Sequence, residues 1–314
     1  MQKVLITGGA GFIGSHTADL LLEEGVRVRV LDNLSSGRRH NLPDRHPLLE
    51  FIEGDIADAD AVNNAMEGVS HCLHLAAQVS VVTSLEDPGL SAKQNILGFV
   101  NVLDAARRAG VRRFVYASSA AIYGEPPKLP LDEALTVKQL SPYGLEKRVN
   151  EYYADLYHRL YGLSSLGTRY FNVYGPRQDP KSPYAGVIAL FVDRIKANQP
   201  VTVFGDGKQT RDFIYVKDVA RANAAALKKT FQGVCNVATG MSTSLLDLIG
   251  TLSALTGNRT EILSSAHRHG DIVNSLGDPS RMNRELEIRA ETSLKDGLAA
   301  LLESMQLSGR NRNL

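Results

Sequence analysis

Residues 7–14 read TGGAGFIG, and they contain the most informative glycine pattern of the chain. Gly8, Gly11 and Gly14 lie three residues apart, between an apolar run that predicts a strand and a periodic stretch that predicts a helix. Glycine loses more conformational entropy on folding than any other residue, so three glycines in so short a stretch need a reason. Their missing side chains indicate that a large group approaches the backbone closely here. In a strand–turn–helix unit, such glycines allow a tight turn, close approach of a pyrophosphate, and close packing of helix on strand. The helix N-terminus then offers free N–H groups to phosphate oxygens.

A carboxylate follows the next predicted strand. Asp32 lies eighteen residues after Gly14, where an acidic side chain accepts hydrogen bonds from ribose hydroxyls and repels a 2′-phosphate. The glycine turn and Asp32 together predict a bound dinucleotide and favour NAD over NADP. Arg38 and Arg39 act against that preference, because an arginine near this position can accept the extra phosphate.

Short apolar runs alternate with helical patterns along the first half of the chain. The predicted strands are Val4–Ile6, Val26–Leu31, a strand starting at Phe51, His71–Leu75, Arg113–Ala117 and Ser164–Arg169. The predicted helices are Phe12–Glu24, Ala61–Met66, Leu90–Ala109 and Tyr143–Tyr161. This alternation indicates βαβ units, and we predict an α/β protein with a Rossmann-type, doubly wound parallel sheet.

The alternation breaks after about residue 175, where prolines become frequent and the elements become shorter. We therefore predict a smaller, loop-rich C-terminal substrate domain over residues 176–314. Residues 1–175 would form the NAD-binding Rossmann domain. A helical pattern within residues 216–240 is expected to pack back on that first domain.

The composition excludes several classes of function. The 314 residues carry a formal net charge of +1, with 43% apolar and 22% charged residues, as is typical of a soluble globular protein. This balance predicts neither nucleic acid nor a membrane as a partner. We expect a cytoplasmic protein, because no secretory signal precedes the first strand and the apolar runs are too short to span a bilayer.

Two cysteines and two histidines could suggest other chemistry. Cys72 and Cys235 lie far apart in strand contexts and are predicted to be buried thiols, not a disulfide. His71 and His74 lie three apart on a predicted strand and so face opposite sides of the sheet. No metal site is predicted.

The stretch YASSAAIYG (116–124) follows the fifth predicted strand, at the sheet edge where open α/β sheets bind ligands. Tyr143 and Lys147 come next and, being four residues apart, share one face of a helix. An ammonium held near a phenol favours the phenolate and lowers the pKa of the tyrosine, as a positively charged nicotinamide would also do. The pattern therefore predicts Tyr143 as a base that works near neutral pH.

Six segments together resemble the extended short-chain dehydrogenase/reductase family and, within it, nucleotide-sugar 4-epimerases of the UDP-glucose 4-epimerase type. They are TGGAGFIGSH (7–16), HLAA (74–77), YASSAAIYG (116–124), SPYGLEK (141–147), RYFNVYGPRQ (169–178) and TRDFIYVKDV (210–219). The resemblance runs from residue 1 to about residue 290. It is highly specific for the family and less specific for the sugar.

The resemblance implies roles for individual residues. Ser119 would hydrogen-bond the sugar hydroxyl, Tyr143 would be the acid/base, and Lys147 would bind the nicotinamide ribose and tune Tyr143. The cofactor would be NAD, with further contacts from Gly8, Gly11, Phe12, Ile13, Gly14, Asp32, Asn33, Asp55, Ile56, Leu75, Ala76 and Ala77. The partner would be a UDP-sugar, contacted by Asn95, Ser119, Tyr143, Asn172, Val187, Val203, Arg211, Arg268, Asp271 and Ser275.

The resemblance implies a 4-epimerase, in which NAD takes a hydride from carbon 4, the keto sugar turns over, and the hydride returns to the other face. A dehydratase would need an Asp–Glu pair after the catalytic hydroxyl residue, where this chain has Ala120 and Ala121, and a decarboxylase also requires a carboxylate at Ala121. A net reductase would prefer NADPH and conflicts with Asp32. A UDP-glucuronate-type 4-epimerase stays open, as does a catalytically silent sensor, although a sensor would be expected to lose Ser119, Tyr143 and Lys147.

The small residue Ser275 bears on which sugar the protein accepts. In the resembling epimerases, the position four after Asp271 lies beside carbon 2 of the sugar. It tends to be tyrosine in enzymes confined to UDP-glucose and UDP-galactose, and small in those that accept N-acetylated sugars. Ser275 therefore predicts UDP-N-acetylglucosamine and UDP-N-acetylgalactosamine as substrates, with room for the plain hexoses. The helices at 90–109 and 143–161 match a pair that forms a four-helix bundle between subunits in related enzymes, so we expect a homodimer.

Overall fold

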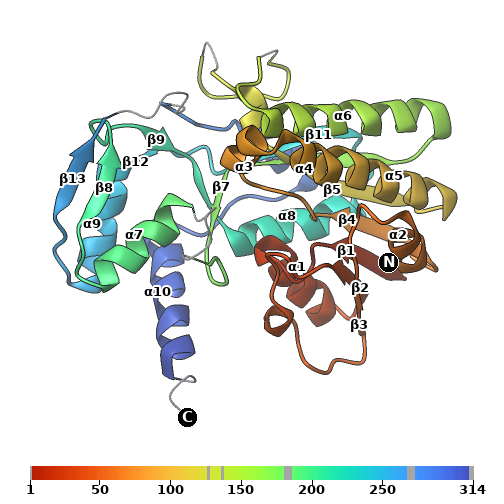
Figure 1. Cartoon of the computed structure of the whole chain (residues 1–314), viewed down its shortest axis with the longest axis horizontal. Coiled ribbons are helices and arrows are strands. Elements are labelled where there is room, and N and C mark those ends of the chain that lie inside the picture. Colours follow the sequence, from red (N-terminus) through yellow and green to blue (C-terminus); the bar gives the residue numbers. More distant parts are fainter. Residues whose placement is uncertain (1, 126–127, 136–137, 180–185, 267–272, 311–314) are drawn as a thin grey trace.

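The computed structural model describes residues 2–125, 128–135, 138–179, 186–266 and 273–310. Seven strands form one parallel sheet in the order β11-β6-β5-β4-β1-β2-β3 (Figure 1). They are β1 (Lys3–Thr7), β2 (Arg27–Asp32), β3 (Leu49–Glu53), β4 (His71–His74), β5 (Arg113–Ser119), β6 (Ser165–Tyr170) and β11 (Gly233–Val237). The strand order reverses between β1 and β4, as in a doubly wound Rossmann sheet, whose ligands bind at this point beyond the carboxyl ends of the strands. The predicted fold class is confirmed.

Helices cover both faces of the sheet (Figure 1). One face carries α1 (Phe12–Glu23) and α8 (Val216–Lys228), and the other carries α2 (Ala59–Met66), α5 (Gly98–Arg108) and α6 (Pro142–Tyr161). Alternation along β1 divides its side chains between the two layers, with Val4 and Ile6 in one core and Leu5 in the other. In the described part of the chain, we find no helix that combines the length and apolarity needed to cross a membrane.

The prediction of one continuous helix over residues 90–109 is wrong, because the structure divides this stretch into several helical segments. The chain there comprises α3 (Val81–Glu86), α4 (Pro88–Ala92), a π-helical turn η2 (Lys93–Leu97) and then α5. The π turn turns Asn95 inward, where its amide hydrogen-bonds both the N–H and the carbonyl of Gln78 at 2.9 Å. A tertiary contact thus widens a helix that the local sequence pattern predicts as continuous.

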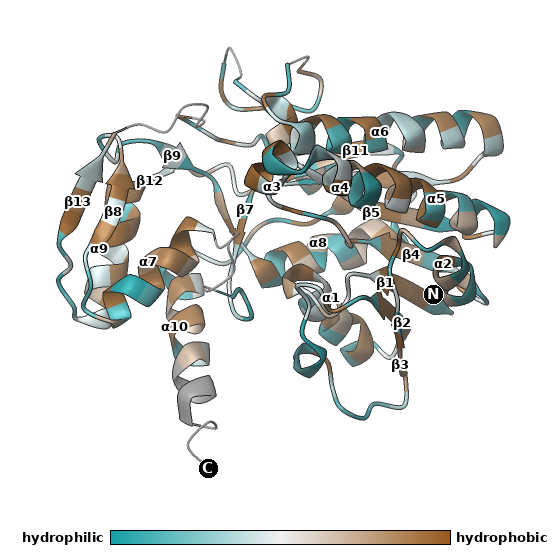
Figure 2. Cartoon of the chain, viewed as in Figure 1, coloured by the Kyte–Doolittle hydropathy of each residue, from teal (hydrophilic) through white to brown (hydrophobic). Residues whose placement is uncertain are grey.

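A second lobe lies beside the carboxyl edge of the sheet (Figure 1). Its elements are β7 (Asn172–Tyr174) paired with β10 (Phe213–Tyr215), β8 (Val201–Phe204) with β13 (Ile262–Ser265), β9 (Thr210–Arg211) with β12 (Thr243–Ser244), and helices α7 (Val187–Lys196), α9 (Leu245–Thr256) and α10 (Leu294–Arg310). The apolar faces of α7 and α9 turn toward the strands (Figure 2). Phe12 and Ile13 pack against this second core, so the glycine turn lies between the two lobes.

Three short turns complete the fold: η1 (Arg39–Asn41), η3 (Ala120–Tyr123) and η4 (Met282–Leu286). The helix predicted within residues 216–240 corresponds to α8, which packs on α1, and the next strand, β11, pairs with β6. The chain therefore enters the second lobe, returns to the sheet, and leaves it again.

Candidate active site

The glycine turn has the geometry that a pyrophosphate needs. Gly8 has φ of +69°, and a Cβ there would come within 2.7 Å of the backbone nitrogen of Ala76. A Cβ on Gly14 would overlap the carbonyl of Gly8. Gly11 caps α1 without a side-chain hydrogen bond, so the first N–H groups of the helix stay available to an anion. The residues present fit a dinucleotide.

Asp32 lies at the carboxyl end of β2 and is almost fully buried. Its two carboxylate oxygens accept hydrogen bonds from the N–H groups of Ala10 and Leu34, both at 2.9 Å. Burial raises the pKa of this carboxyl, and the two backbone N–H groups act in the opposite direction. Lone pairs remain on both oxygens for ribose hydroxyls.

The neighbouring arginines are engaged elsewhere. Arg38 pairs with Asp179 at 3.4 Å, and both side chains are exposed. The Arg39 guanidinium lies 5.1 Å from the centre of the Phe51 ring and donates to the carbonyls of Leu42 and Pro43. Neither arginine is directed at Asp32 by a hydrogen bond or ion pair among the described residues.

Other predicted cofactor contacts lie at neighbouring strand ends. Asn33 donates to Asp55 at 3.1 Å, which links the segments that follow β2 and β3. Ile56 is a core side chain packed on Gly98, and its carbonyl accepts a hydrogen bond from the Asn101 amide at 3.0 Å. Leu75, Ala76 and Ala77 follow β4 and lie over the glycine turn, with the Leu75 N–H donating to the Thr7 carbonyl at 3.0 Å.

The start of α6 brings together the residues that the sequence predicts to be catalytic. Ser141 caps the helix by accepting from the Gly144 N–H at 3.1 Å, and Pro142 occupies the first turn. A Cβ on Gly144 would come within 2.7 Å of the Ala121 carbonyl, so only glycine lets the helix approach the end of β5 this closely. Tyr143 therefore lies beside Ser119, with which its hydroxyl forms a hydrogen bond.

Lys147 lies one helical turn further along α6 and is buried. Its Nζ donates to the Ala117 carbonyl at 3.2 Å and lies 5.8 Å from the centre of the Tyr143 ring. Burial lowers the pKa of Lys147 to about 8. Burial raises the pKa of Tyr143, while the hydrogen bond to Ser119 lowers it. The expectation that Lys147 brings the pKa of Tyr143 below its ordinary value is wrong for the protein alone, because desolvation of the phenol outweighs the favourable contacts.

A pocket of about 250 Å³ opens between β7, β10 and α7. Three residues assigned to substrate from the sequence line it: Asn172, Val187 and Arg211. Gln178 lines it too, and in the described part of the chain its buried Oε1 accepts no hydrogen bond. Sequence reasoning quoted Gln178 within a motif and assigned it no role, because only the fold shows that it borders this pocket.

The remaining predicted substrate residues are placed differently. Val203 is buried in the core of the second lobe, and both amide hydrogens of Asn95 are donated within the protein, to Gln78 and Glu146. Ser275 is 7% exposed and donates its N–H to the Thr210 carbonyl at 3.1 Å, beside β9. Arg268 and Asp271 lie outside the described residues.

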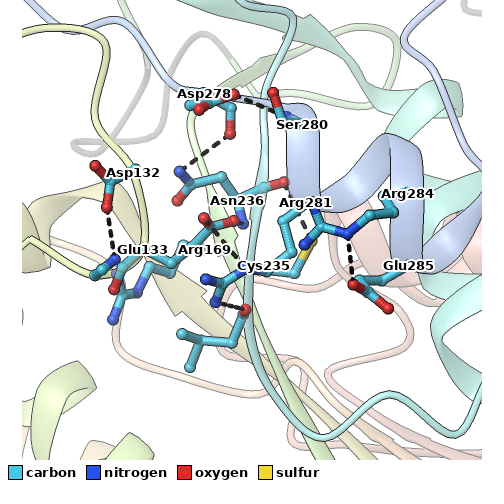
Figure 3. Close-up of polar contacts among 12 residues, drawn as sticks. Asp132, Glu133, Arg169, Cys235, Asn236, Asp278, Ser280, Arg281, Arg284 and Glu285 are labelled. Atoms are coloured by element: carbon cyan, nitrogen blue, oxygen red, sulfur yellow. Dashed lines mark hydrogen bonds and ion pairs between the residues drawn. The ribbon is translucent and has the colours of Figure 1, made fainter.

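A network of polar contacts holds the segment around Asp278, three residues after Ser275 (Figure 3). Leu131 receives a backbone hydrogen bond from Asp278 at 2.9 Å and donates one to Leu276 at 2.8 Å. Next to it, Glu133 accepts from the Asn236 N–H at 2.8 Å and lies 3.5 Å from Arg281. The loop between Ser119 and Tyr143 is thereby attached to the strand-like segment that follows residue 273.

Comparison with known proteins agrees with this geometry. The profile described as the NAD dependent epimerase/dehydratase family matches residues 4–238. A putative UDP-glucose 4-epimerase of Methanocaldococcus jannaschii is 41% identical over 98% of this chain and 99% of its own.

Two solved structures superpose on 98% of this chain and 99% of their own. One is the UDP-glucose 4-epimerase of Thermotoga maritima with UDP-glucose, at 38% identity and a TM-score of 0.93. The other is the UDP-N-acetylglucosamine 4-epimerase of Methanobrevibacter ruminantium in complex with UDP-N-acetylmuramic acid, at 35% identity and a TM-score of 0.94.

The fold and the site define a dinucleotide-dependent enzyme of the short-chain dehydrogenase/reductase type. The chain belongs to the NAD dependent epimerase/dehydratase family, and its cofactor is NAD. The resemblance drawn from the six sequence segments is confirmed. The prediction of an NAD-dependent enzyme of the epimerase class is confirmed with it.

Proposed function

We propose that this chain interconverts the 4-epimers of a UDP-hexose, and that UDP-N-acetylglucosamine and UDP-N-acetylgalactosamine are its preferred pair. Ser275 carries the choice of sugar. It is a small, buried residue in the segment that runs beside β9, two residues from Val273, whose carbonyl accepts from Arg211 at 3.2 Å. A small side chain at this place leaves room for an acetamido group. The likeness to the M. ruminantium enzyme supports the same choice.

When bound, NAD accepts a hydride from carbon 4 of the sugar and returns it to the opposite face. Tyr143 is proposed to remove and return the proton of the 4-hydroxyl, with Ser119 hydrogen-bonded to that hydroxyl and to the phenol. Lys147 is proposed to hold the ribose and to stabilise the phenolate. Because burial raises the pKa of Tyr143, the phenolate needs both the Lys147 ammonium and the positive charge of the oxidised cofactor.

The pocket lined by Asn172 and Arg211 is proposed to hold the nucleotide diphosphate. A guanidinium meets phosphate oxygens with two parallel hydrogen bonds, which suits Arg211. Gln178 adds an amide oxygen to the same wall. This oxygen accepts no hydrogen bond from the described residues, so an N–H or O–H group of the nucleotide sugar can satisfy it.

The residues that follow Ser119 support epimerisation over elimination. Ala120 and Ala121 form the start of η3, and the Ala121 N–H donates to the Ser119 hydroxyl at 3.1 Å. Neither methyl side chain can transfer a proton, so the chain offers no acid and base at the positions where a dehydratase requires them.

A homodimer through a four-helix bundle is part of the proposal. Apolar side chains are exposed along α3, α4 and η2, among them Val82 at 59% and Leu85 at 61%. The helix α6 lies beside α5 (Figure 1). Its side chains Leu145 and Tyr152 are exposed as well. Apolar patches of this kind are typical of surfaces that another chain covers.

Proton NMR of the purified protein with separate UDP-sugars tests the proposal. UDP-N-acetylglucosamine, UDP-glucose and UDP-glucuronate are incubated without added cofactor, and formation of each 4-epimer is followed. We expect the fastest conversion with the acetylated sugar. Conversion of UDP-glucuronate alone, or of no UDP-sugar, would contradict the proposal.

Asp32→Ala should narrow the preference for NAD over NADP by roughly tenfold to a hundredfold. The substitution removes two charge-assisted hydrogen bonds to the ribose and the repulsion of the 2′-phosphate. Calorimetric titration of both cofactors into the stripped protein measures the effect. Arg38→Ala is the matched control and should leave the preference unchanged, because its guanidinium pairs with Asp179. Wild-type protein that retains mainly NADP would show that Arg38 and Arg39, and not Asp32, determine the choice of cofactor.

A further inference from the structure

One buried carboxylate beside the catalytic pair has no role in the chemistry described so far. Glu146 lies between Tyr143 and Lys147 in the sequence and is 4% exposed. Its Oε2 accepts hydrogen bonds from the Ser91 hydroxyl at 2.8 Å and from the Asn95 amide at 2.7 Å. Burying a carboxylate is costly, and both donors are neutral.

The hydrogen bonds of Glu146 extend through Asn95 and Ser91 to Gln78, in the segment that follows β4. The Asn95 side chain accepts a hydrogen bond from the Gln78 N–H and donates one to the Gln78 carbonyl. The side-chain amide of Gln78 in turn donates to Ser91 at 3.2 Å. Gln78 directly follows Ala76 and Ala77, the segment that lies over the glycine turn. Glu146 therefore ties the catalytic helix to the strand end that covers the cofactor.

The charge of Glu146 also acts on both catalytic side chains. It raises the pKa of Lys147, against the larger effect of burial, and it raises the pKa of Tyr143. The other titratable group near Lys147 is His74 on β4, whose pKa burial lowers to about 3, so it is neutral. Among the described residues, the carboxylate accepts hydrogen bonds from Ser91 of α4 and Asn95 of η2, and Lys93 of η2 is exposed.

We propose that Glu146 is a positioning residue for the epimerase, holding the Gln78 segment against the cofactor and supplying the negative charge that balances the buried Lys147 ammonium. A neutral glutamine at 146 could still accept from Ser91 and Asn95 through its amide oxygen. The two hydrogen bonds therefore do not require a charged residue at position 146. The effect of the negative charge is on the pKa values of Lys147 and Tyr143. The proposal rests on the proposed function for its catalytic meaning.

Glu146→Gln and Glu146→Ala separate the charge from the hydrogen bonds. Without the negative charge, the ammonium of Lys147 is less favoured, so its pKa should fall by about one unit in both variants. Titration of the Lys147 Nζ signal by ¹⁵N NMR in the NAD-loaded protein measures this, with Lys147→Arg assigning the signal. The alanine variant should also retain less NAD on gel filtration, because it releases Asn95 and Gln78.

Activity supplies a second readout. Both limbs of the pH profile of kcat/KM should move to lower pH in Glu146→Gln, since the pKa values of Tyr143 and Lys147 both fall. Asp155→Asn on the exposed side of α6 removes a charge from the same helix and should move neither limb.

An unchanged pKa of Lys147 in the neutral variants overturns the role of the charge, and either variant suffices if the other fails to fold. Wild-type NAD retention in Glu146→Ala overturns the positioning role. If the wild-type protein converts no UDP-sugar, the proposed function fails while the NMR titration still decides the role of Glu146.

Discussion

Tyr143→Phe should leave the protein folded and loaded with NAD while lowering turnover by roughly two to four orders of magnitude. The substitution removes one oxygen and leaves the ring, which lies over Lys147 with its centre 5.8 Å from Nζ. The lost hydroxyl is the group hydrogen-bonded to Ser119, and it is the group that we propose as the base.

The measurement is kcat on the preferred UDP-sugar, with the NAD content and the melting temperature recorded for the same preparation. Ser119→Ala is the matched comparison. It should lose less activity, because Tyr143 can still reach the sugar hydroxyl directly. Near-normal turnover in Tyr143→Phe would end the proposed mechanism, whatever the effect of Ser119→Ala.

Sequence reasoning reached the Rossmann half of the molecule because its signals are local. The spacing of Gly8, Gly11 and Gly14 reflects a turn that forms within a few residues, and the four-residue spacing of Tyr143 and Lys147 is a property of any α-helix. The end of β5 faces the same edge as the glycine turn because all of the strands paired in this sheet are parallel. Topology therefore places these motifs together once the strands are assigned.

The short strands of the second lobe and the direction of the pKa shift of Tyr143 could not be predicted from the sequence, for the opposite reason. The two-residue strands β9 and β12 exist only through pairing with each other, and two residues carry no periodicity that could predict a strand. The sign of the pKa shift of Tyr143 depends on how completely its surroundings exclude water, which is a property of the packed site. The π turn at Asn95 and the position of Gln178 at the pocket likewise depend on contacts between distant segments.

Ser275→Tyr should abolish turnover of the acetylated pair while sparing conversion of UDP-glucose and UDP-galactose. Ser275 is 7% exposed, and backbone hydrogen bonds join its segment to Thr210, next to Arg211 at the pocket. The same segment is fixed from the other side by Leu131. With the backbone held on both sides, a phenol ring cannot be accommodated by moving the segment, so it must fill space next to the side chain. We propose that this space takes the acetamido group.

Steady-state kinetics on all four sugars tests whether the side chain at position 275 limits the size of the sugar. Ser275→Ala is the matched control, because it removes the hydroxyl and adds no bulk, and it should keep the acetylated activity within a few-fold of wild type. The decisive quantity is the ratio of kcat/KM between the acetylated pair and the plain pair of sugars. A general loss of stability would lower both activities together, whereas steric exclusion of the acetamido group changes the ratio. If Ser275→Tyr converts the acetylated sugars as well as wild type does, another residue limits the size of the sugar.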